Sequence, residues 1–563
     1  MKHSGTYDHY YLYQEITDLL RGYAQAHPHL TKLHSIGMTP QGRDIWALEI
    51  TDTSCGGFDE KPAFYVEGNI HAGEVTGSMC VMYFLDTLFS NLEDPSVARL
   101  LKDHTIYAVP RVSPDGSEHY LTTPDAVRSA PRRYPFAQVM PGLNRCDLDG
   151  DGVIRMMRVR TPYGVWKPSE KDPRLMTRRR PDDREGDFYN IYEEGVIEEF
   201  DGLNITEAPA AFGNDFNRNY PVGWQTEDLQ KGAGAYPLCH PETRANADFL
   251  MQHPNVCFVV DMHTSGGQNL FTPGFESSKK AHAADIALYR SLGAIAKEEN
   301  GYPVLNVYDD YMPASASVTY GGFDDFCHFV LGIPAMTIEC WDLSERAGVP
   351  LEYPPRETIP EAEEEENAVK FLQWMDANLP AGEGFRPWQT FSHPQLGEVE
   401  IGGCDEKFIR QNPPIPFLQQ ELEKHTRFML RAVNTLPSVC FESVTSTPLG
   451  GDLYRVEAIV GNRGFMPTYV FEEGLKSKAL EELTLTLSAE GCTFETGKAA
   501  QKIGHLEGLS GVAAHNNGLR MTSSQKNPLR KKVTWLLRGP RGALLILRCH
   551  GGRIGCVCTE AVL

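Results

Sequence analysis

The stretch that most constrains the fold is a buried strand that runs directly into a loop with ligand-type side chains. Residues 63–66 are apolar, and residues 68–74 follow them with His71 and Glu74 three positions apart. An imidazole and a carboxylate at the end of a strand can turn toward one point, and this pair suits Zn²⁺. An ordinary loop histidine beside a solvated glutamate fits the same pattern. Because residues 79–89 are typical of a buried helix, the stretch predicts one unit of an α/β sheet.

Length and charge limit the classes of protein to consider. The chain has 563 residues and a formal net charge of −22, which predicts two or three domains and argues against nucleic acid as a partner. No apolar run approaches the roughly 20 residues that cross a bilayer, so no membrane segment is expected. The N-terminus lacks the apolar core of a signal peptide, and the 13 cysteines are scattered. We therefore expect a cytoplasmic location, or a secreted one if a signal was removed.

Two later segments supply further candidates for a metal site. The apolar strand 256–261 ends at His263, which is placed like His71 and provides a third ligand. The apolar segment 333–342, which ends at Asp342, places one carboxylate inside the expected strand, that of Glu339. Burial would raise the pKa of Glu339 toward that of a proton shuttle. Structural pairing of this buried acid is the alternative interpretation.

Residues 120–212 differ in composition from their surroundings and read as an insertion. They are rich in Arg, Asp, Pro and Gly, and Asp147, Asp149 and Asp151 stand at alternate positions before a glycine. This spacing matches the first half of a Ca²⁺ loop, although position 12 holds Arg158 in place of a bidentate Glu. Both a Ca²⁺ site and a plain Asx-rich turn remain open.

Six short motifs in a fixed order carry a resemblance to a known family. They are His71-x-x-Glu74, Pro114-Asp115-Gly116, Asp215-x-Asn217-Arg218-Asn219, His263-Thr264, Gly321-Gly322-x-x-Asp325 and Thr337-Ile338-Glu339. Over residues 7–380 the chain resembles zinc metallocarboxypeptidases of the carboxypeptidase A type. The resemblance implies an α/β/α domain with a mixed, mostly eight-stranded sheet, a peptide substrate, and one zinc ion held by His71, Glu74 and His263.

The same resemblance implies roles for other residues. Glu339 would be the general base that takes a proton from the attacking water and passes it to the leaving amine. Asp215 would orient a ligand imidazole through its second nitrogen. Asn217 and Arg218 would clamp the terminal carboxylate of the substrate, because a guanidinium matches a carboxylate in two parallel hydrogen bonds.

Several positions in the resemblance leave alternatives. The family arginine that polarises the scissile carbonyl falls on Arg128, with Arg132 and Arg133 as competitors. The family also has a mobile tyrosine, and at the equivalent spacing this chain has Ser317. We predict that Tyr320 takes this role, with Tyr308 and Tyr311 as the alternatives.

One further departure and one specificity position follow from the comparison with the family pattern. Gly73 replaces an arginine that is common between the first two ligands, which indicates remodelled outer subsites. Asp324 takes the position at the base of the pocket for the departing side chain, where an acid would favour Lys or Arg. Asp324 could instead cap a helix that begins near Asp325.

The catalytic pattern ends near Pro380. We predict a catalytic domain over 1–380, a linker and helix over 381–436 and a β-sandwich-like domain over 437–563, because short alternating runs recur after Pro437.

Three functions remain open at this stage. A zinc metallocarboxypeptidase fits the motifs best. The alternatives are a related zinc amidohydrolase that deacylates N-acyl amino acids, and an inactive peptide-binding module; the latter would need a lost ligand or base.

Overall fold

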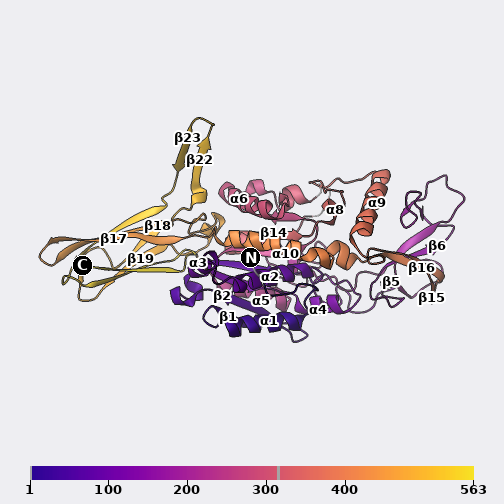
Figure 1. Cartoon of the computed structure of the whole chain (residues 1–563), viewed down its shortest axis with the longest axis horizontal. Coiled ribbons are helices and arrows are strands. Elements are labelled where there is room, and N and C mark those ends of the chain that lie inside the picture. Colours follow the sequence, from indigo (N-terminus) through magenta and orange to yellow (C-terminus); the bar gives the residue numbers. More distant parts are fainter. Residues whose placement is uncertain (1–2, 313–317) are drawn as a thin grey trace.

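A mixed eight-stranded sheet forms the centre of the computed structural model, which describes residues 3–312 and 318–563 (Figure 1). In spatial order its strands are β1 (Thr31–Met38), β2 (Asp44–Ile50), β4 (Thr105–Val109), β3 (Ala63–Gly68), β11 (Val256–Thr264), β14 (Ala335–Cys340), β12 (Gln268–Phe271) and β13 (Val304–Asn306). The four strands from β4 to β14 are parallel. The carboxyl ends of β3, β11 and β14 therefore meet at one edge.

Helices cover both faces of this sheet. Along β3, Phe64 and Val66 enter one hydrophobic core and Ala63 and Tyr65 enter the other, as strand alternation requires. The first core also takes α1 (Tyr13–Ala26), α2 (Val75–Ser90), α3 (Pro95–Asp103), α6 (Ala283–Asn300) and α10 (Ile415–Val433), together with Tyr120 from α4 (Pro114–Thr122). The second takes α5 (Pro241–Gln252) and α7 (Phe323–Phe326). The predicted α/β/α arrangement is confirmed.

A second, six-stranded sheet lies at the end of the molecule away from the C-terminus (Figure 1). Its order is β15 (Phe385–His393), β16 (Gly397–Cys404), β6 (Met156–Arg160), β9 (Tyr189–Glu193), β7 (Trp166–Pro168) and β8 (Met176–Arg178). A separate pair beside it consists of β5 (Gly142–Arg145) and β10 (Gly195–Glu198). Residues from the predicted insertion thus share a sheet with a hairpin from much later in the chain.

The segment that we expected to be a linker is structured throughout. Residues 385–404 form the β15–β16 hairpin, and β16 pairs with β6. Val399 and Ile401 pack on Met157, and Arg158 forms a 2.8 Å ion pair with Glu400. The linker interpretation of these residues was wrong because their pairing partner lies far upstream, where local composition gives no hint of it. The helix expected within residues 381–436 runs over Ile415–Val433 as α10.

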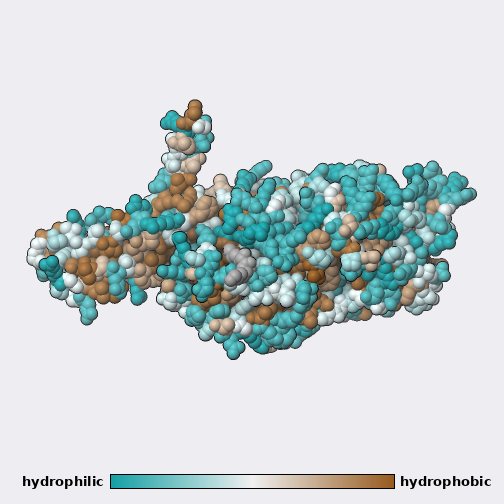
Figure 2. Space-filling model, viewed as in Figure 1, coloured by the Kyte–Doolittle hydropathy of each residue, from teal (hydrophilic) through white to brown (hydrophobic). Residues whose placement is uncertain are grey.

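The C-terminal residues form two packed antiparallel sheets, as predicted. One contains β17 (Val439–Gly450), β18 (Leu453–Asn462), β24 (Arg530–Arg538) and β20 (Thr493–Thr496). The other contains β21 (Ala500–Gly504), β19 (Leu483–Ala489), β25 (Leu544–His550) and β26 (Cys556–Val562). Alternate residues of both sheets share one core. The hairpin of β22 (Val512–Asn516) and β23 (Met521–Gln525) projects from this unit (Figure 2).

The C-terminal unit is anchored to the central one by a buried guanidinium. Arg553 donates hydrogen bonds to the carbonyl oxygens of Pro254 (3.0 Å), Val256 (3.2 Å) and Leu331. These carbonyls precede or open β11 and β14, the strands that carry His263 and Glu339. Among the described residues, no helix combines the length and hydrophobicity that a bilayer span requires.

The three aspartates of the proposed calcium loop lie together, but neighbouring arginines form ion pairs with two of them. Ligand-type oxygens of Asp147, Asp149 and Asp151 lie within 4.8 Å of one another. Arg386 pairs with Asp149 at 2.9 Å and also with Asp151, and Arg155 pairs with Asp151 at 2.7 Å. The Asx-rich turn explains this loop, and the calcium prediction gains no support.

Candidate functional site

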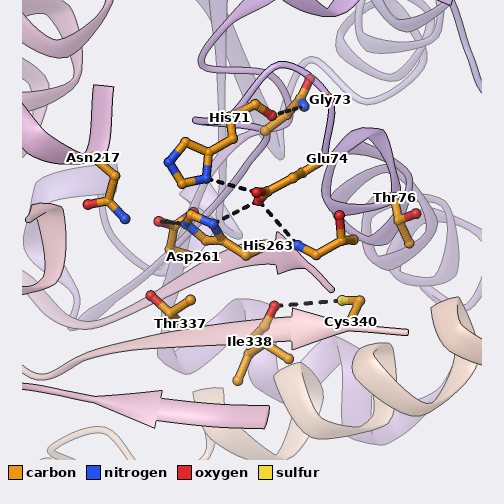
Figure 3. Close-up of polar contacts among 12 residues, drawn as sticks. His71, Gly73, Glu74, Thr76, Asn217, Asp261, His263, Thr337, Ile338 and Cys340 are labelled. Atoms are coloured by element: carbon orange, nitrogen blue, oxygen red, sulfur yellow. Dashed lines mark hydrogen bonds and ion pairs between the residues drawn. The ribbon is translucent and has the colours of Figure 1, made fainter. Parts of the chain in front are cut away.

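Three ligand-type side chains converge at the carboxyl edge of the central sheet. His71 Nδ1 lies 2.9 Å from Glu74 Oε1, and His263 Nδ1 lies 2.8 Å from Glu74 Oε2. All three residues are at most 3% exposed, and their donor atoms fall within 4.8 Å of one another. Figure 3 shows both imidazoles directed at the Glu74 carboxylate. Because β3 and β11 are neighbours in the sheet, His71 in the loop after β3 and His263 near the end of β11 come together although they are far apart in the sequence.

The backbone of the ligand loop is fixed by local contacts. Asn69 has a positive φ of 66°, and its amide donates to the carbonyl oxygens of His71 (2.6 Å) and Ala72 (3.1 Å). A Cβ at Gly68 would lie 2.6 Å from the backbone of Gly77 in α2, so this strand end can approach the helix only without a side chain. The loop therefore holds the ligand pair close to the start of α2.

Each imidazole is held from behind by an aspartate. His71 Nε2 lies 3.1 Å from Asp215 Oδ1, and His263 Nε2 lies 2.7 Å from Asp261 Oδ2. Carboxylates on Nε2 fix the tautomer that leaves Nδ1 free as a ligand atom, and both Nδ1 atoms face the same point. Two imidazoles and a buried carboxylate in this arrangement fit the donor set of a catalytic zinc site.

The charges of Glu74 and His263 depend strongly on each other and on their buried neighbours. Burial alone would raise the pKa of Glu74, but His71 and His263 hold it well below its usual range. Burial alone would lower the pKa of His263, but Asp261 and Glu74 raise it well above its usual range.

Glu339 lies beside the ligands on the neighbouring strand. In the parallel pairing of β11 and β14, His263 is directly opposite Glu339. Glu339 Oε2 is buried without a hydrogen-bond partner among the described residues. Burial raises the pKa of Glu339 to about 8, with His263 opposing this shift and Glu74 adding to it. A carboxyl group of this kind can exchange protons near neutral pH.

Of the three candidate arginines, the structure brings Arg128 to the site. Arg128 donates from Nε to Asp215 (3.0 Å) and from Nη1 to Glu74 (3.3 Å). Arg132 instead pairs with Glu242 at 2.9 Å, and Arg133 lines a separate cavity. Of these three arginines, only Arg128 therefore lies where its guanidinium could contact a substrate beside the ligands.

A cavity of about 380 Å³ contains the ligands, Glu339 and Arg128. Asn217 and Arg218 also line it. Asn217 Oδ1 accepts a hydrogen bond from the N–H of Phe323 (2.7 Å), and Arg218 Nη1 donates to the carbonyl oxygen of Asn217 (2.7 Å). These contacts turn the amide and the guanidinium along one wall.

Asp324 lies in the cavity wall and does not cap a helix. It sits inside α7, whose N-cap Gly322 makes no side-chain capping bond. Asp324 Oδ2 accepts from Thr337 Oγ1 (2.7 Å), and Oδ1 is buried without a partner among the described residues. Burial, with a further contribution from Asp261, raises the pKa of Asp324 to about 7. Asp324 thus lines the cavity with one carboxylate oxygen left without a partner among the described residues.

The tyrosine in the site is Tyr311, not Tyr320. Tyr311 lines the cavity, and its ring lies 6.4 Å from that of Tyr353. Tyr320 is absent from the cavity wall; its backbone N–H donates to Gln230 and its ring lies near Gly223. Ser317 lies outside the described residues. A spacing counted along the chain does not fix which side chain lines the cavity, and the role of Tyr320 stays a prediction.

One supporting residue was missed from the sequence. Asp261 stands two positions before His263 on the same strand, so both side chains share a face of the sheet. The motif Asp-x-His at the end of an apolar strand was the available signal. The resemblance named only Asp215 for such a role.

Comparison with protein families agrees with this geometry. A family model described as "Zinc carboxypeptidase" matches residues 16–368, and a model described as a domain of unknown function matches residues 438–562. Mouse carboxypeptidase D is 30% identical over 111 residues, which are 20% of this chain and 8% of that protein. A zinc carboxypeptidase of Saccharothrix mutabilis subsp. capreolus is 31% identical over 118 residues, 21% of this chain and 27% of that protein. The matches thus span a small part of each relative.

Solved structures give a more distant likeness. The crystal structure of thrombin activatable fibrinolysis inhibitor has a TM-score of 0.39 and 16% identity, covering 67% of this chain and 77% of that one. Carboxypeptidase A from Helicoverpa armigera has a TM-score of 0.38 and 15% identity, covering 66% of this chain and 73% of that one. Likeness at this level adds nothing to the assignment.

Proposed function

Because the chain belongs to the zinc carboxypeptidase family, we propose that it is a zinc-dependent carboxypeptidase that hydrolyses the C-terminal bond of peptides. His71, Glu74 and His263 would hold the zinc ion. The observation that carries this proposal is the convergence of both Nδ1 atoms on Glu74, inside a cavity that also holds Glu339 and Arg128. A zinc ion held there would lower the pKa of a water molecule toward 7 and polarise the scissile carbonyl.

Glu339 would move the proton of the reaction. It would accept the proton of the attacking water and deliver it to the nitrogen of the departing amino acid, so that the C–N bond breaks as a C–O bond forms. Its Oε2, which has no hydrogen-bond partner among the described residues, supports this role. Arg128 would stabilise the negative charge that develops on the carbonyl oxygen.

Asn217 and Arg218 would restrict cleavage to the end of a chain. A guanidinium and an amide on one cavity wall can bind a terminal carboxylate, and a substrate without it leaves the guanidinium unpaired. Arg128 and this pair line the same cavity, which supports one substrate pose with the scissile bond between them.

A substrate comparison tests this proposal against deacylation. The carboxypeptidase should release the last residue of a blocked dipeptide that has a free C-terminal carboxylate. It should not cleave the same dipeptide when its C-terminus is amidated. Hydrolysis of N-acetyl amino acids in preference to the blocked dipeptide would favour the deacylase, which the family match does not support.

Replacing Asp261 with Asn should weaken zinc binding by roughly 10–100-fold, the usual cost of losing a partner of a ligand histidine. The amide keeps the shape but lacks the charge that fixes His263 through its Nε2. Competition with a chelator measures the affinity directly. Asp86→Asn is the matched control, since Asp86 is equally buried but binds Ser4 and Gly5. Equal zinc affinities in the two variants would contradict this role of Asp261.

Asp324 supports a preference for basic C-terminal residues as the finer part of the proposal. Asp324 lines the cavity, one of its carboxylate oxygens has no partner among the described residues, and its pKa of about 7 predicts that the carboxylate forms as pH rises through neutrality. The ratio of kcat/KM for Lys-ending over Leu-ending peptides should therefore increase from about pH 6 to about pH 8. Asp324→Ala should abolish both the preference and its pH dependence. A wild type that prefers Leu at both pH values would refute this preference.

A further inference from the structure

A two-stranded hairpin projects from the C-terminal unit into solvent. This hairpin, which we call the arm, consists of β22 and β23 and covers residues 512–525 (Figure 1). Every residue from 513 to 525 is exposed, and among the described strands β22 and β23 pair only with each other. An isolated two-stranded hairpin is marginally stable in water at best. The arm therefore lacks the packing that stabilises the other strands, and a partner would supply it.

The end of the arm is an ordered turn that presents apolar side chains. The N–H of Asn517 donates to the carbonyl oxygen of Arg520 (3.2 Å), and the N–H of Arg520 donates to the side chain of Asn517 (2.7 Å). Leu519 is 100% exposed and Met521 is 75% exposed. Figure 2 shows hydrophobic surface at this end of the arm. The tip, by which we mean residues 519–521, therefore carries one positive charge between two apolar side chains.

The arm lies in a long stretch of the chain that contains no acidic residue. Residues 508–559 include nine Lys and Arg residues and no Asp or Glu, in a chain whose net charge is −22. Arg530 and Lys532 on β24 form ion pairs with glutamates of β17 and β18. Arg520 and Lys526 form no ion pair among the described residues. The arm thus carries uncompensated positive charge, which an acidic surface would attract.

The chain itself provides an acidic surface of matching character. Residues 352–366 contain seven glutamates and a single basic residue. Glu357 and Glu364 are exposed, and neither forms an ion pair among the described residues. Leu351 and Ile359 add apolar surface, 47% and 41% exposed. The acidic segment, by which we mean residues 351–366, therefore offers free carboxylates beside apolar side chains, as the tip of the arm requires.

The positions of the two surfaces suit contact between two molecules. Figure 1 shows that the arm and α9 (Glu361–Asn378), whose first turns belong to the acidic segment, rise from the same side of the molecule. They lie toward opposite ends of that side, with α6 between them, so the two surfaces of one molecule stay apart. A two-fold axis that turns this side of two copies toward each other would bring each arm to the partner's acidic segment, in two identical contacts.

We propose that two copies of this chain form a dimer by exchanging arms, with the tip of each arm bound to the acidic segment of the other copy. Arg520 would pair with the free carboxylates, and the apolar side chains of the tip would pack on Leu351 and Ile359. Because each copy is strongly acidic, other contacts between copies would suffer from repulsion. The dimer does not depend on the proposed carboxypeptidase function.

Sedimentation equilibrium of the full chain tests this inference. The mass of the wild type should rise from 62.9 kDa toward twice that value as the concentration increases. The dissociation constant should increase with ionic strength, because salt screens exposed charges. Arg520→Glu should raise the dissociation constant by roughly 10-fold or more, since each dimer would contain two repelling contacts. Leu519→Ser combined with Met521→Ser should raise it as well, and substitutions at such exposed positions have little effect on folding.

Arg541→Glu is the matched control, because Arg541 is exposed and lies in the same stretch without acidic residues but outside the arm. It should keep the wild-type dissociation constant. A wild type that stays monomeric at every concentration, or a dimer that persists unchanged in both arm variants, would overturn the proposal.

A charge exchange tests the partner surface. Glu357→Arg combined with Glu364→Arg should weaken the dimer, and adding Arg520→Glu to this pair should restore it, because the attraction between the two surfaces is then reversed in sign but retained. If the combined variant dissociated as readily as Arg520→Glu alone, the acidic segment would not be the surface that binds the arm.

Discussion

Glu339→Gln is expected to lower kcat by roughly 100-fold or more while the bound zinc remains, which is the usual scale for loss of general acid–base catalysis. Glutamine preserves the size and one carbonyl oxygen of the side chain but cannot carry the proton between water and the leaving amine. Glu339 is not part of the group of three converging ligand atoms, so metal content should stay at the wild-type level. Steady-state kinetics and metal analysis on the same preparation measure both effects.

Glu194→Gln is the matched control for this substitution. Glu194 is also buried, and burial raises its pKa to about 7, but it directly follows β9 of the six-stranded sheet and binds the N–H groups of Leu148 and Arg155. Its replacement should leave kcat within a few fold, on the usual scale for a site outside the chemistry. If Glu339→Gln were as active as this control, Glu339 would be a structural acid.

His263→Ala is expected to remove tight zinc binding and, with it, hydrolysis. The substitution deletes one of the three atoms that converge at the site and leaves Glu74 and Asp261 without their shared partner. The loss of affinity should exceed the roughly 100-fold that follows from losing a supporting hydrogen bond. Chelator competition and metal content after dialysis give the result.

His393→Ala controls for the loss of a buried imidazole. His393 is 3% exposed and binds the carbonyl oxygen of Gly195 at the far end of the molecule. This variant should bind zinc as the wild type does. Full zinc content and activity in His263→Ala would remove His263 from the ligand set.

Much of the fold could be predicted because its signals are local. The apolar run at residues 63–66 and the apolar strand that ends at His263 both form central strands, and the alternating runs after Pro437 form the two packed sheets. The β15–β16 hairpin could not be predicted in the same way. Its partner β6 lies far upstream, and pairing across such a separation depends on tertiary contacts such as Arg158 with Glu400.

The residues of the candidate site show the same difference between local signals and contacts that depend on the tertiary fold. Residues at strand ends, such as His71 and Glu339, were found because the pattern of apolar strands places them. Residues outside the central strands were harder to predict. Tyr311 ends the helical turn Val307–Tyr311 and lines the cavity, whereas Tyr320 does not line it, and spacing along the sequence does not distinguish the two. Asp261 was missed because the resemblance gave the supporting role to Asp215 alone, although His263 was already a predicted ligand two positions away.

Zinc titration of the metal-free wild type tests the central claim most directly. Release of the C-terminal residue from a blocked peptide should be absent without zinc, rise in proportion to added zinc, and level off at about one zinc ion per chain, as three protein ligands around one ion require. Full hydrolysis before any zinc is added, or stoichiometric zinc binding with no hydrolysis of peptides ending in basic, apolar or acidic residues, would contradict the account.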